Sequence, residues 1–135
     1  MSSLNSRLRA YAPYVLSILR IVAALLFLEH GLSKFFGWPM PARPGSTFEL
    51  ISIVGLAAVI ETVGSVLVLL GLFTRIAAFV MSGEMAVAYF TAHLLNSFFP
   101  LLNRGEGAVF FCFVFLYLVF AGPGPWSLDA KRGSA

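Results

Sequence analysis

Charged residues are scarce in this chain. Lys, Arg, Asp and Glu make up 11% of its 135 residues, less than half of the roughly 25% that is usual for a soluble domain. Hydrophobic residues make up 59%, and the mean hydropathy is +0.91. A chain this short cannot bury so much apolar surface in one core, and a disordered chain needs high charge and low hydrophobicity. The composition therefore excludes a soluble globular protein and a disordered one, and it indicates a membrane protein.

Cysteine and histidine are also rare. The single cysteine, Cys112, excludes an internal disulfide framework, a Cys-x-x-Cys redox pair and a cysteine-rich zinc site, and it stands among aromatic residues, where we expect it to act as a hydrophobe. Two histidines, His30 and His93, are too few for a three-histidine metal centre. We therefore expect neither haem nor a bound metal. The net charge of +3 is small and scattered, so nucleic acid is not an expected partner.

Four apolar stretches predict four transmembrane helices, at about residues 14–36, 48–73, 76–95 and 106–122. Each of the first three has about 20 residues or more, which is enough to cross a hydrocarbon layer of ~30 Å. The fourth is shorter. The predicted fold is an all-α membrane protein, a four-helix bundle that forms a single domain over residues 1–135.

Short polar and proline-rich segments separate these stretches. Pro39, Pro41 and Pro44 are expected to keep the first connection extended. Residues 46–49, Ser-Thr-Phe-Glu, have the spacing of a capping box and predict the start of the second helix. Asn103 is predicted to cap the fourth helix in the same way.

The distribution of Lys and Arg predicts the orientation. With four spans both termini lie on one side, and that side carries Arg7, Arg9, Arg75, Lys131 and Arg132. The other side carries Lys34, Arg43 and Arg104. Cytoplasmic loops hold the excess of positive charge, so both termini are predicted to be cytoplasmic.

Three ionisable residues fall in the inner half of the predicted spans, at a depth where an ion costs ~2.5–3.5 kcal/mol on insertion scales. Arg20, Glu61 and Glu84 lie at overlapping depths in the inner half, and we expect them to form one coupled network. They form either a structural lock on helix register or a ligand or proton site, and the sequence leaves both open. One stripe of the first helix is expected to face inward with them: Arg20, Ala24, Phe27, Gly31 and Lys34.

A second polar group lies toward the outer side. Lys34 and His30 are candidates for ligand binding, and Glu29, His93 and Glu106 are secondary candidates. Simpler roles compete with each: a snorkelling anchor for Lys34, a helix cap for Glu106, and hydrogen bonding at helix ends for the histidines. His30 and His93 share a depth but fall on different helix faces.

Several short motifs occur in a characteristic order. They are Gly31-Leu32-Ser33-Lys34, Glu61-Thr62-Val63-Gly64, residues 70–78, residues 83–90 ending at His93, Asn103-Arg104-Gly105-Glu106, and residues 122–129. Over about residues 14–130 this ordered set resembles the DoxX family of small four-helix bacterial membrane proteins. The resemblance implies a multi-pass protein of the bacterial inner membrane, similar to the membrane subunit of thiosulfate:quinone oxidoreductase or to members of membrane redox and thiol-stress complexes. It supplies no catalytic residues, and the absence of a cysteine pair departs from the quinone-linked thiol enzymes.

These observations favour a membrane protein that binds a quinone-like or other small apolar ligand within a redox assembly. Arg20, Lys34 and His30 would donate hydrogen bonds, and Glu61 or Glu84 would relay a proton. An accessory subunit of an oxidoreductase is favoured over a stand-alone enzyme. A proton-coupled transporter or channel and a non-catalytic scaffold are the alternatives. The expected partners are the lipid bilayer and redox-enzyme subunits, with a homo-oligomer left open.

Overall fold

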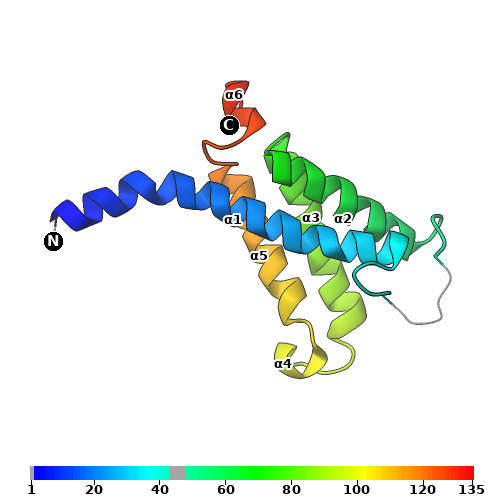
Figure 1. The fold of residues 1–135 in the computed structure, drawn as a ribbon. Helices are drawn as coiled ribbons and strands as arrows, with labels where there is room; N and C mark the ends of the chain where they lie inside the picture. The colour runs from blue at the N-terminus through cyan, green and yellow to red at the C-terminus, as the bar shows by residue number, and fades with distance from the viewer. Residues whose placement is uncertain (1, 43–47) are drawn as a thin grey trace.

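The computed structural model describes residues 2–42 and 48–135, and within these residues every regular element is helical (Figure 1). The elements are α1 (Ser2–Phe36), α2 (Ile53–Leu70), α3 (Thr74–Ala88), the π-helical turn η1 (Tyr89–His93), α4 (Pro100–Asn103), α5 (Glu106–Ala121) and α6 (Leu128–Lys131). The prediction of an all-α protein is confirmed.

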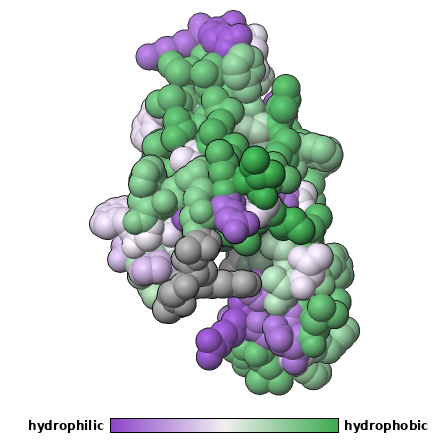
Figure 2. All heavy atoms as spheres, turned by 90° about the vertical axis from the view of Figure 1, so that its right-hand side faces the viewer, coloured by the Kyte–Doolittle hydropathy of each residue, from purple (hydrophilic) through white to green (hydrophobic). Residues whose placement is uncertain are grey.

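Two helices are long and apolar enough to cross a membrane. The 18-residue windows of α1 and α2 reach mean hydropathies of 2.0 and 2.4, yet only 28% and 33% of their residues are buried inside the protein. The helix α5 is also apolar but has 16 residues. Hydrophobic residues cover most of the face in Figure 2, and a surface of this kind suits contact with lipid.

The four longer helices pack as two antiparallel pairs. The helix α1 lies along α2 and α3 lies along α5, and the two pairs cross where α2 meets α3. The N-terminal part of α1 extends beyond the other helices, while α6 lies close to the turn between α2 and α3 (Figure 1). That turn is tight because Gly71 adopts a left-handed conformation, with φ of 65°, in which glycine has no steric penalty.

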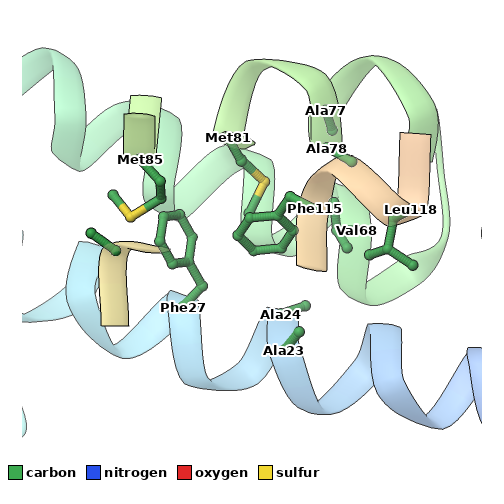
Figure 3. Close-up of a cluster of buried hydrophobic side chains, with 11 residues drawn as sticks. Ala23, Ala24, Phe27, Val68, Ala77, Ala78, Met81, Met85, Phe115 and Leu118 are labelled. Atoms are coloured by element: carbon green, nitrogen blue, oxygen red, sulfur yellow. The ribbon is translucent and has the colours of Figure 1, made fainter. Parts of the chain in front are cut away.

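The hydrophobic core sits where the pairs cross. Phe27 of α1 reaches toward Met85 of α3, while Phe115 of α5 lies beside Met81 (Figure 3). The predicted inward stripe of α1 is confirmed, since its first four members are buried and Lys34 is half-buried. Small residues on this stripe allow close packing of α1 against α2.

The helix starts differ from the sequence prediction in two places. The helix α1 begins at Ser2 instead of residue 14, and α2 begins at Ile53 instead of residue 48. Ser52 is the N-cap of α2, because its hydroxyl oxygen accepts a hydrogen bond from the Gly55 amide at 3.0 Å. The predicted capping box at residues 46–49 is therefore wrong as the start of α2. Its Ser46 and Thr47, like Pro44 of the preceding loop, lie outside the described residues.

The bounds of α3 and the cap of α5 also differ from the prediction. The helix α3 begins at Thr74 and continues through η1 to His93. The predicted cap of α5 by Asn103 is wrong, because Gly105 is the N-cap residue. The Asn103 side chain instead accepts a hydrogen bond from the Gly105 amide at 2.7 Å, so it shapes the turn one step before the helix.

Candidate functional site

A buried ion pair joins α1 to α2. The Lys34 Nζ atom donates to both carboxylate oxygens of Glu61, at 2.7 and 2.6 Å. The Glu61 side chain is 3% exposed and that of Lys34 is 20% exposed. The last turn of α1 holds Lys34 and the middle of α2 holds Glu61. Lys34 therefore turns inward, and its predicted role as a snorkelling anchor is wrong.

A close approach of the two helices supports this ion pair. At Gly31, one turn before Lys34, an added Cβ would lie 2.3 Å from the Thr62 hydroxyl oxygen and 2.9 Å from the Thr62 backbone nitrogen. No larger residue fits without moving backbone. Gly31 therefore brings the end of α1 close enough to α2 for the ammonium group to reach Glu61.

A second carboxyl group lies beside the ion pair. Glu61 precedes the end of α2 by nine residues and Glu84 follows the start of α3 by ten, so the two lie at about 14 and 15 Å along antiparallel helices. Their carboxyl groups are neighbours. The Glu84 Oε2 atom is buried and has no hydrogen-bond partner among the described residues. We call Lys34, Glu61 and Glu84 the Lys34 cluster.

Two adjoining pockets open beside Lys34. The larger has a volume of about 560 Å³ and the smaller about 370 Å³, and Ser33, Lys34, Pro41 and Ala42 line both. Phe35, Phe48 and Val54 add apolar lining to the larger one. Lys34 thus stands between these pockets and the carboxyl groups of the buried Glu61 and the half-buried Glu84, with its ammonium on the carboxylate side.

Arg20 does not join this cluster, so the predicted network of Arg20 with Glu61 and Glu84 is wrong. Its guanidinium is fully buried and donates to four backbone carbonyls, those of Val68, Leu69, Pro123 and Trp126. The register of α1 on α2 sets Arg20 opposite the last turn of α2, whose carbonyls have no partner within the helix. Glu61 lies seven residues before Val68, about 10 Å away along the axis.

Asp129 has a structural role that the sequence analysis missed. Its carboxylate accepts hydrogen bonds from the amides of Phe73 and Thr74, at 3.0 and 2.9 Å, and so caps the start of α3. The contact joins residues 55 positions apart, so no local pattern reveals it. Burial by itself would raise the pKa of Asp129, but the hydrogen bonds from Thr74 and Phe73 and the charge of Arg132 outweigh it and leave the pKa below its usual value.

This capping contact predicts a pH-dependent contribution to stability. Because the pKa of Asp129 is lowered in the folded state, its contribution is present above the unfolded pKa of about 3.9 and is lost as the pH falls through the folded value. We expect Asp129→Asn to lower the free energy of unfolding at pH 7 by about 1 kcal/mol. Denaturant unfolding in detergent at pH 7 and at pH 3 measures this. A difference between variant and parent that does not shrink at pH 3 would contradict it.

The two histidines differ in position: His30 lines the smaller pocket beside Lys34, and His93 lines neither pocket. His30 is exposed, and its Nδ1 atom lies 3.2 Å from the Leu26 carbonyl oxygen of its own helix. His93 Nδ1 lies 3.0 Å from the Asn103 carbonyl oxygen, which matches the expected hydrogen bonding at a helix end. The described residues contain no group of three His, Cys, Asp or Glu side chains that would hold a metal ion.

The remaining acidic candidates are exposed. Glu29 lines the smaller pocket beside Lys34. Glu106 lies in the first turn of α5, where no side chain caps the helix. Its negative charge interacts favourably with the dipole of α5. It makes no capping hydrogen bond within the described part of the chain, so its predicted role as a cap is wrong.

Comparisons with known proteins assign the chain to a family. A family model described as DoxX matches residues 15–94. An uncharacterized protein of Haemophilus influenzae is 46% identical over 93% of this chain and 96% of its own length. An uncharacterized membrane protein of Mycobacterium tuberculosis is 31% identical over 95% of this chain and 89% of its own.

A third relative carries a functional name. A protein of Bacillus subtilis named "Putative oxidoreductase CatD" is 29% identical over 83% of this chain and 82% of its own length. No solved structure matches the chain. The matched region of the family model includes all three members of the Lys34 cluster and Arg20.

Proposed function

Because this chain belongs to the DoxX family of membrane proteins, we propose that it binds a small quinone-like molecule beside the Lys34 cluster, as the membrane subunit of a redox assembly. The observation that carries the proposal is the position of Lys34, between a pocket of about 560 Å³ and the carboxyl groups of the buried Glu61 and the half-buried Glu84. Pockets of this size that combine apolar and polar lining residues are typical of small-molecule sites.

The chemistry of Lys34 suits a quinone carbonyl. An ammonium group has three donors, and two of them are directed at the oxygens of Glu61. The third is free to bind a carbonyl oxygen in the pocket, while Phe35, Phe48 and Val54 offer apolar contact to the ring. A ligand that draws the ammonium toward the pocket weakens its contact with Glu61.

The two carboxyl groups suit proton exchange with such a ligand. Glu61 and Glu84 share one cation, so a surplus negative charge would remain at membrane depth if both were ionised. A proton held between them removes that surplus. When a ligand draws Lys34 away, we expect the pair to bind the proton more tightly, so that ligand binding and proton uptake are linked.

Electrons would come from a partner. Reduction of a quinone to a quinol takes up two electrons and two protons, and the single Cys112 provides no dithiol to supply the electrons. The relative named as an oxidoreductase in Bacillus subtilis supports a redox setting. In this proposal the chain holds the ligand and its protons, and another protein supplies the electrons.

We further propose that α1, α2, α3 with η1, and α5 are four spans of a bacterial inner membrane, with both termini cytoplasmic. The C-terminal segment packs on the α2–α3 turn through Arg20, and Lys and Arg are concentrated there, as in cytoplasmic loops. A phosphatase that works only in the periplasm, fused after Ala135, is expected to be inactive. An active fusion would contradict this orientation.

Tryptophan fluorescence offers a direct test of binding. Trp38 lies between Gly37 and Pro39, which line the two pockets, and Trp126 lies at the opposite end, packed on Tyr14. In detergent, a short-chain ubiquinone should quench the fluorescence of the Trp126→Phe variant, which retains Trp38, in a saturable way. The matched variant Trp38→Phe should show only weak, linear quenching. Equal, non-saturable quenching of both variants would reject the pocket as the site.

A further inference from the structure

A separate groove lies at the end of the protein opposite Lys34. It has a volume of about 490 Å³ and runs between α1, the end of α5 and the C-terminal segment. Arg9 and Arg75 line it together with the apolar Leu16 and Pro123 and the ring of Tyr117. It shares no lining residue with the pockets beside Lys34, so the proposed function does not account for it.

Both guanidinium groups in the groove have N–H donors without a hydrogen-bond partner among the described residues. Arg75 Nη1 donates to the carbonyls of Val119 and Phe120, each at 2.7 Å, which fixes the guanidinium at the end of α5. Its Nη2 and Nε atoms have no hydrogen-bond partner in the described part of the chain, and neither has the side chain of Arg9. Guanidinium groups bind phosphate oxygens in pairs of parallel hydrogen bonds.

The surrounding charge favours an anion. Besides the buried Arg20, five exposed cationic side chains occur at this end: Arg7, Arg9, Arg75, Lys131 and Arg132. The one acidic side chain there, Asp129, is engaged by the amides of Phe73 and Thr74. Ala135 lines the groove as well.

The position of the groove selects the kind of anion. Tyr14 and Trp126 form an aromatic pair beside it, with ring centroids 5.7 Å apart, and such residues gather at the membrane–water interface. Leu16 and the exposed apolar residues of α1 and α5 lead from the groove along the sides of the helices. A phosphate bound here would therefore lie at headgroup level, with an apolar surface beneath it for acyl chains.

We propose that this groove binds the phosphate headgroup of an anionic phospholipid, held by the guanidinium groups of Arg9 and Arg75, with its acyl chains along α1 and α5. Each arginine near a membrane surface attracts anionic lipid by about 1 kcal/mol, which corresponds to roughly fivefold in affinity. The two together are expected to favour phosphatidylglycerol over phosphatidylcholine by more than tenfold.

Native mass spectrometry of the purified full chain tests this preference. The protein is mixed with equal amounts of phosphatidylglycerol and phosphatidylcholine that carry the same acyl chains. The double variant Arg9→Gln/Arg75→Gln should lose the preference. The control Arg7→Gln/Lys131→Gln removes the same charge from the same end without touching the groove, and it should keep the preference. Arg9→Gln alone, which breaks no contact within the described residues, should lower the preference roughly fivefold even if Arg75 variants fold poorly.

Three results would overturn the proposal. Equal binding of the two lipids by the parent protein would show that the headgroup is not recognised. Equal losses in the groove variant and in the control would show diffuse charge attraction instead of a site. Displacement of phosphatidylglycerol by an equal concentration of soluble glycerol 3-phosphate would show a site for free phosphate esters that does not use the acyl chains.

Discussion

Arg20→Met is expected to lower the free energy of unfolding by at least about 3 kcal/mol, because it leaves the carbonyls of Leu69, Pro123 and Trp126 without a donor among the described residues. The guanidinium is fully buried and serves four carbonyls from two distant parts of the chain. Its loss should therefore also release the segment that carries Asp129 from the α2–α3 turn. Denaturant unfolding in mild detergent measures the change.

Arg75→Met is the matched control for this experiment. Arg75 also donates to two backbone carbonyls, but its side chain is exposed, so water can replace it. We expect a loss of about 1 kcal/mol or less. A loss for Arg20→Met no larger than that of Arg75→Met would contradict the structural role of Arg20.

Lys34→Met is expected to have the second large effect. It removes the cation that pairs with Glu61 and leaves this buried carboxylate beside Glu84 without a cationic partner in the described part of the chain. Breaking a buried ion pair on one side costs about 3–5 kcal/mol. Glu61→Gln in the same background should restore part of the loss, because the uncompensated charge disappears. The double variant should therefore lose less than the two single variants summed.

A double-mutant cycle of Arg20→Met and Glu61→Gln distinguishes this arrangement from a single network of Arg20, Glu61 and Glu84. The two side chains serve different groups about 10 Å apart along α2, so their effects on stability should add. Strong coupling between Arg20 and Glu61, or strict additivity between Lys34 and Glu61, would contradict the contacts described above.

The sequence predicted the helical fold and the inward face of α1 because both depend on local periodicity. Apolar runs and the stripe from Arg20 to Lys34 follow from composition and from 3.6 residues per turn. It also placed Glu61 and Glu84 at overlapping depths, since both are counted from the same tight turn between α2 and α3. The sequence could not choose the cation that meets them.

Which cation meets the carboxyl groups depends on the register of α1 against α2, and no local sequence pattern encodes that register. Gly31 fixes the register by its close approach to Thr62, and this register sets Lys34 on Glu61 and Arg20 on the last turn of α2. The capping of α3 by Asp129 joins residues far apart in the chain. Contacts of this kind become visible only when the helices are packed.

Isothermal titration calorimetry of a short-chain ubiquinone, repeated at one pH in two buffers with different ionisation enthalpies, measures the number of protons taken up on binding. This measurement tests most directly the claim that the Lys34 cluster links ligand binding to a proton. We predict uptake of a measurable fraction of a proton by the parent protein and by Glu106→Gln, which alters an exposed carboxyl group outside the cluster, and clearly less by Glu84→Gln. Binding without proton uptake in the parent, or uptake that persists unchanged in Glu84→Gln, would contradict the account.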